Sequence, residues 1–161
     1  MPILHFQLNQ KFKTPGGKTV VTPPELLMLN QGPRFQVLIS VAQSVADQLV
    51  AKGQPIPAPI SGWGLIDTGA SNTCVDEAVA QKLQLPVIDV VQMTTPSHAS
   101  VQQNVYPIVL EFLGFNVRLD VPRAMGATLA NQGLVALIGR DFLQHCTLFY
   151  NGITGQVTLS I

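Results

Sequence analysis

Short apolar segments alternate with polar breaks along the chain, which contains thirteen glycines and twelve prolines. Residues 34–41 and 101–112 have the composition of strands in a packed sheet, and residues 3–12 alternate loosely between apolar and polar positions. Other segments rich in Val, Ile, Leu and Thr predict strands at residues 63–66, 87–93, 115–121, 134–138, 146–150 and 156–161. The pattern therefore predicts a mostly β fold with frequent turns.

Three short helices are predicted between these strands. The first starts within Thr22-Pro23-Pro24-Glu25, because proline is favoured in a first helical turn, and Gly32-Pro33 stops it. The second covers residues 42–52 and ends at Gly53, and the third covers residues 76–83. Asn151-Gly152, between two predicted strands, indicates a hairpin near the end of the chain.

Three alternating prolines make residues 54–59 the best linker candidate in the chain. We interpret them as a loop between two strands, because neither half of the sequence looks like a complete core. The prediction is one structural domain. Its core is residues 62–161. Residues 1–61 form a strand and helix extension with the Pro-rich loop, and they are integrated into the same lobe.

Composition excludes several functional classes. The chain has 161 residues, 47% of them hydrophobic, and its formal net charge is zero, so a phosphate-tracking surface and a nucleic-acid partner are not expected. No apolar run approaches the roughly 20 residues of a spanning helix, and no signal peptide is visible. We therefore expect no membrane partner and a cytoplasmic protein. The two cysteines are expected to be reduced, buried thiols.

The candidate chemistry lies in the tripeptide Asp67-Thr68-Gly69. A carboxylate at the end of a buried apolar strand is costly unless it is hydrogen-bonded or functional. Thr68 places a hydroxyl beside it, and Gly69 allows a turn that a side chain would block. Alone, however, Asp-Thr-Gly is also a common turn sequence.

A second motif, Leu137-Ile138-Gly139-Arg140, follows downstream at the start of a short polar helix. With both motifs in this order, the sequence resembles the retropepsin-like aspartic proteases, the single-lobe relatives of pepsin, and its closing segment is similar to bacterial members. The resemblance covers residues 63–161. It implies a single-lobe, closed β-barrel with short helices that is active as a two-fold homodimer.

The resemblance also implies roles for individual residues. Asp67, Thr68 and Gly69 would be catalytic, with Thr68 hydrogen-bonding across the dimer axis. Leu137, Ile138, Gly139 and Arg140 would support the site from behind the catalytic turn, with Gly139 at the point of close contact. Substrate would be bound by Ala70, Ser71 and Asn72, and by a flap whose tip contains Thr95, Pro96, Ser97 and His98.

The sequence departs from the retroviral pattern in three places. The predicted flap is poor in glycine, and Ser71 and Asn72 replace acidic residues that would pair with Arg140. Residues 1–61 have no close match in a minimal viral protease, so they are either an added layer or a segment removed by self-cleavage. The intact mass of the wild type and of Asp67→Asn separates these two possibilities.

The implied mechanism needs two aspartates, and the chain contains one Asp-Thr-Gly. A homodimer supplies the second Asp67 by symmetry. The two carboxylates share a proton and activate a water that attacks the scissile peptide carbonyl. The expected activity is that of an aspartic endopeptidase acting on a peptide or protein substrate at acidic pH. No metal and no organic cofactor is implied.

Other interpretations remain open. Asp141 is a second aspartate, but its position after Gly139 favours a helix-capping or structural role. A nucleophilic pair of Cys74 and His98 is conceivable, but a buried thiol and an exposed loop histidine are favoured. The chain could also be a catalytically silent dimerisation or peptide-binding module of the same fold, or an unrelated small β-barrel in which the tripeptide is only a turn.

Overall fold

The computed structural model describes residues 2–95 and 98–161. Its strands are β1 (Ile3–Gln7), β2 (Gln10–Lys13), β3 (Thr19–Thr22), β4 (Arg34–Val41), β5 (Ile60–Ile66), β6 (Cys74–Asp76), β7 (Asp89–Thr95), β8 (His98–Phe112), β9 (Val117–Ala127), β10 (Leu134–Ile138), β11 (Thr147–Asn151) and β12 (Gln156–Ser160). Its helices are α1 (Pro24–Gln31), α2 (Gln43–Ala51), α3 (Glu77–Lys82) and α4 (Arg140–Leu143), with a 3-10 turn at Ala130–Gln132.

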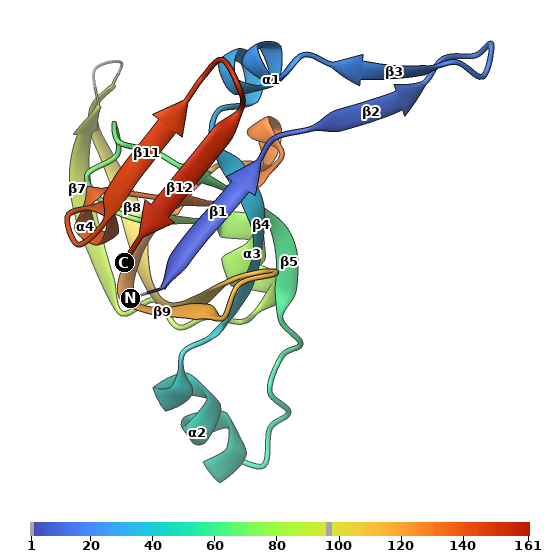
Figure 1. The fold of residues 1–161 in the computed structure, drawn as a ribbon. Helices are drawn as coiled ribbons and strands as arrows, with labels where there is room; N and C mark the ends of the chain where they lie inside the picture. The colour runs from blue at the N-terminus through green and yellow to red at the C-terminus, as the bar shows by residue number, and fades with distance from the viewer. Residues whose placement is uncertain (1, 96–97) are drawn as a thin grey trace.

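Six strands close into a barrel in the order β4-β5-β10-β6-β9-β8, because β8 also pairs with β4. β10 runs parallel to β5, and β6 runs parallel to β9, whereas the other neighbours in the barrel are antiparallel. β7 extends the sheet beyond β8 as an antiparallel hairpin (Figure 1). The predicted mostly β, closed-barrel fold is confirmed.

The barrel is filled by side chains that alternate along its strands. In β4, every second residue from Phe35 to Val41 is buried, as expected for a strand with one face on the core. The ring of Phe35 stacks on that of Phe112 with centroids 4.7 Å apart. Such pairs add to the stabilisation from apolar burial.

A second sheet, in the order β1-β12-β11, packs against the same core. Leu4 of β1 and Val157 and Leu159 of β12 are almost completely buried, and Phe6 meets Phe35 edge-on at 5.5 Å. The N-terminal and C-terminal strands therefore lie side by side, and the two ends of the chain lie close together (Figure 1).

Two parts project from this body. β2 and β3 form a two-stranded sheet of their own that extends beyond α1, and α2 with the Pro-rich loop extends at the opposite end (Figure 1). None of the helices in the described part of the chain is both long and apolar enough to cross a membrane.

Several predicted elements need correction. Residues 3–12 are not one strand, because β1 ends at Gln7 and a separate strand begins at Gln10. β9 continues through Pro122 to Ala127, well beyond the predicted end at residue 121. The hairpin after β11 uses four residues rather than Asn151-Gly152 alone, because the Asn151 Oδ1 accepts hydrogen bonds from the amides of Ile153 and Thr154.

Candidate active site

Asp67 stands directly after β5, in a turn at one end of the barrel. Its side chain is half-buried, and Oδ1 accepts hydrogen bonds from the amide of Gly69 at 2.8 Å and from that of Ala70 at 3.2 Å. Thr68 and Gly69 are exposed. The turn thus holds the carboxylate in one orientation while presenting its own tip to solvent.

The motif around Gly139 holds this turn from behind. The amide of Asp67 donates to the carbonyl of Ile138 at 3.0 Å, and β10 runs beside β5 in parallel register. A Cβ at Gly139 would overlap the Asn72 carbonyl, so only glycine allows the two backbones to approach this closely. The close contact expected of Gly139 is therefore present.

Arg140 binds the Asp67 turn directly. Its Nη1 donates to the carbonyls of Thr68 at 2.7 Å and Gly69 at 2.9 Å, and its Nη2 donates to Ser71 Oγ at 2.8 Å. At position 71 the group that Arg140 contacts is therefore a hydroxyl. A planar guanidinium can make all three bonds at once.

Thr73 and Asp141 complete the support, and the motifs did not predict their pairing. Thr73 Oγ1 accepts a hydrogen bond from the Gly139 amide at 3.2 Å and donates to Asp141 Oδ1 at 2.9 Å. Asp141 Oδ2 accepts from the Thr73 amide at 2.9 Å. The structure therefore gives Asp141 a structural role, as favoured, although Gly139 is the residue at the helix N-cap. Thr73 is almost completely buried, which the sequence alone does not show.

Asp67 and Thr68 border a hollow of about 290 Å³ whose other walls include Leu148 and Tyr150 of β11. The sequence motifs gave no indication of this neighbour, because β11 lies about 80 residues downstream. A separate cavity of about 510 Å³ begins at Asn72 and continues along β9. Of these two, only the first hollow is lined by Asp67.

The other predicted substrate residues lie on two elements. Ala70, Ser71 and Asn72 continue the Asp67 turn. Thr95 and His98 are paired in register at the tip of the β7–β8 hairpin, so the predicted hairpin is present, although its strands reach further toward the tip than expected. Pro96 and Ser97 lie outside the described residues.

The cysteines do not have the properties of nucleophiles. Burial, with smaller contributions from the negative charges of Asp141 and Asp67, raises the pKa of Cys74 to about 11. Burial also raises the pKa of Cys146 above its ordinary value. Both thiols are free, and within residues 2–95 and 98–161 no cluster of three or more His, Cys, Asp or Glu side chains could hold a metal ion.

No protein-family model matches the sequence, and no curated protein is similar enough to match it. Among solved structures, the chain is similar to a retropepsin-like aspartic protease from Rickettsia conorii, with a TM-score of 0.44 and 13% identity over 98% of this chain and 90% of that one. It is also similar to the retroviral protease-like domain of Ddi1 from Leishmania major, with a TM-score of 0.38 and 12% identity over 73% of this chain and 80% of that one. Both similarities are distant, and they concern the path of the backbone.

Proposed function

We propose that the chain is one half of a homodimeric aspartic endopeptidase, with one Asp67 from each subunit in the active site. The observation that carries the proposal is the geometry of the Asp67 turn. A carboxylate is oriented by two backbone amides at the end of a strand, and the turn is held by Ile138 and Arg140 while its tip stays exposed. Such an exposed tip is free to meet its copy across a two-fold axis.

The surface next to this turn supports a dimer. Phe149 and Tyr150 of β11 and Ile153 in the following turn are 55%, 48% and 81% exposed. β11 is also an edge strand, and Tyr150 shares the hollow that contains Asp67. Exposed apolar groups that gather at a sheet edge mark an interaction surface. A second copy placed here would bring its own Asp67 turn toward the first.

The proposed chemistry follows from two adjacent carboxylates. Like charges this close do not both ionise readily, so the pair holds one proton between them. The ionised Asp67 takes a proton from a water molecule, and the oxygen of that water attacks the peptide carbonyl. The protonated Asp67 donates a hydrogen bond to the developing oxyanion, and the leaving nitrogen then receives a proton from the pair.

The substrate we propose is an extended peptide. Ala70, Ser71 and Asn72 offer backbone groups and small polar side chains next to the carboxylate. The β7–β8 hairpin, in which Thr95 and His98 are the last pair described, would close over the bound peptide and exclude water. An extended chain presents alternate side chains to the two sides of such a site.

The test is peptide cleavage by wild type and Asp67→Asn at mildly acidic pH, read by mass spectrometry of a peptide library. We expect wild-type cleavage that declines as the pH rises and the shared proton is lost, and no cleavage by Asp67→Asn. Asp47→Asn is the matched control, because Asp47 is an exposed carboxylate on α2. It should cleave like wild type.

Equal cleavage by wild type and Asp67→Asn would refute the proposal, and so would activity that is highest above neutral pH. If no variant cleaves but peptides still bind, the chain is instead a catalytically silent module of the same fold. A silent module has no evident need for the ordered Asp67 carboxylate, which is why we favour the enzyme.

A further inference from the structure

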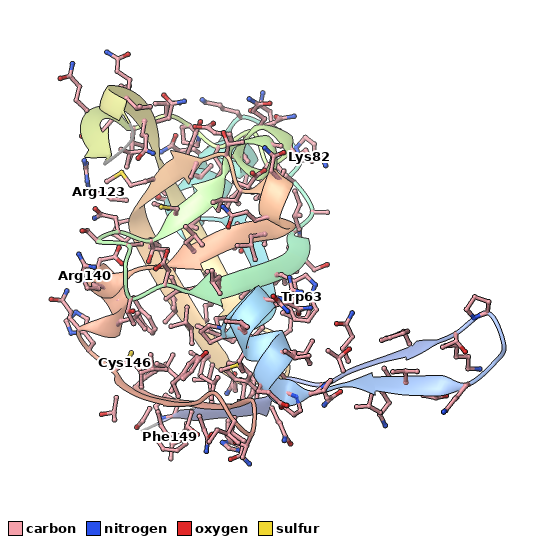
Figure 2. All side chains as sticks on the ribbon, turned by 90° about the horizontal axis from the view of Figure 1, so that it is seen from above. Trp63, Lys82, Arg123, Arg140, Cys146 and Phe149 are labelled. Carbon is pink, nitrogen blue, oxygen red and sulfur yellow. The ribbon has the colours of Figure 1, made fainter. Side chains whose placement is uncertain are left out.

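The hairpin of residues 10–22, here called the arm, consists of β2, β3 and the turn that joins them. Its two strands pair only with each other. Both views show it extending away from the body (Figures 1 and 2). At its base, Gln31 Nε2 of α1 donates to Gln10 Oε1 at 3.1 Å. A lone two-stranded hairpin is only marginally stable in water. Within residues 2–95 and 98–161 no third strand pairs with the arm to stabilise it.

One face of the arm is apolar at its centre. Phe12 and Val20 are directly paired in register, so their side chains share a face. Phe12 is 50% exposed, and Val21 on the opposite face is 54% exposed. Leaving a large aromatic ring this open forgoes the stabilisation that its burial would bring.

Charge distinguishes the arm from the rest of the molecule. Of nine cationic residues in the chain, Lys11, Lys13 and Lys18 lie in the arm, which contains no carboxylate. The rest of the chain contains the other six cationic residues and all nine acidic ones. Its formal charge is therefore −3, whereas that of the arm is +3. A second copy of the chain therefore offers the arm a body of complementary charge.

The base of the arm adjoins the surface that we propose for dimerisation. The amide of Leu8 donates to the carbonyl of Gly155 at 2.9 Å, so the chain entering the arm is tied to the β11–β12 turn. This turn carries Ile153, and β11 before it carries Phe149 and Tyr150. The arm thus leaves the body at the rim of the exposed apolar surface.

We propose that the arm clasps a second copy of this chain, with its Phe12–Val20 face against the partner. Lys11 and Lys13 extend from the opposite face of the arm, and their positive charge attracts the acidic body of the partner. Two-fold symmetry makes the exchange reciprocal, so each subunit gives one arm and receives one. The inference rests on the dimer of the proposed function, but it concerns the arm and not the catalytic turn.

The test measures the dimer dissociation constant by sedimentation, in an Asp67→Asn background that prevents self-cleavage. Lys11→Glu with Lys13→Glu should raise the constant by about tenfold or more, and should remove much of its dependence on salt. Lys52→Glu with Lys82→Glu makes the same charge change outside the arm and should alter the constant by less than about twofold. Thermal unfolding of each variant checks that the body still folds.

A photo-cross-linking amino acid at position 12 gives an independent measurement. We expect a covalent product of two chains, and a product within one chain would overturn the clasp. Unchanged dimerisation in the Lys11 and Lys13 variant would overturn it as well, while leaving the protease proposal intact. If the background protein is monomeric at every concentration, both proposals fail together.

Discussion

At the scale of single residues, the candidate site depends on groups that orient Asp67 rather than on further reactive groups. Arg140 donates to the carbonyls of Thr68 and Gly69, and Thr73 links Gly139 to Asp141. Hydrogen bonds to charged groups are worth about 1.5–3 kcal/mol when they are shielded from solvent, and less when exposed as at Arg140. The carboxylate is thereby held in place before any substrate arrives.

Cys74 provides a prediction at this scale. Because burial raises its pKa to about 11, the thiol stays protonated at neutral pH and should resist alkylation by iodoacetamide in the folded protein. Cys74→Ala should retain proteolysis, measured as peptide cleavage. Rapid labelling of Cys74 at neutral pH, or loss of cleavage in Cys74→Ala, would argue instead for a thiol in the chemistry.

The same pKa makes stability depend on pH. A folded-state pKa raised above the ordinary value of 9.0 gives a stabilisation that is complete below that value and is lost as the pH rises toward about 11. The unfolding free energy of the wild type should therefore fall more steeply across this window than that of Cys74→Ala. Denaturant titrations at several pH values measure the difference.

At the scale of elements, the contact between the Gly139 segment and the Asp67 turn determines whether the site can form. In Gly139→Ala the new methyl group would overlap the Asn72 carbonyl, which belongs to backbone and cannot simply rotate away. We expect a loss of about 3 kcal/mol in unfolding free energy together with a loss of cleavage. Calorimetry and the peptide assay measure the two effects.

Gly16→Ala is the control for this substitution, because no atom lies within 4 Å of a Cβ built at Gly16. It should change stability by less than about 0.5 kcal/mol. If Gly139→Ala were as stable and as active as Gly16→Ala, the close contact would not be needed for the site.

Some elements could be predicted because local pattern and packing agree. β4 and β10 have the predicted bounds, since each contains an uninterrupted apolar pattern that is buried in the barrel. β6 was not predicted, because three residues are too few to show an alternation of apolar and polar positions. The predicted β9 ended too early, because Pro122 suggests the end of a strand. The Thr73–Asp141 contact joins residues 68 positions apart, which no local pattern reveals.

At the scale of the whole molecule, the residues before position 62 contribute to the body. β4 closes the barrel between β5 and β8, and β1 completes the second sheet beside β12. That closure requires two parallel pairings, which strand patterns alone do not specify. The assignment of the whole chain to one domain and the removal of residues 1–61 by self-cleavage both remain predictions.

The tip of the Asp67 turn, the apolar side chains of Phe149 and Tyr150 on β11 and much of the arm are exposed to solvent. A second copy would engage all three, because a two-fold axis beside Asp67 also brings β11 and the base of the arm near the partner. The dimer is therefore central to the account at this scale, and catalysis should depend on pairs of chains.

Subunit mixing tests that claim most directly. Wild-type and Asp67→Asn chains are unfolded together in equal amounts, refolded at a fixed total concentration, and assayed for peptide cleavage. Because every active dimer needs two intact Asp67 side chains, activity should fall to about a quarter of that of wild type alone. If each chain carried a complete site, about half would remain, and that result would contradict the account.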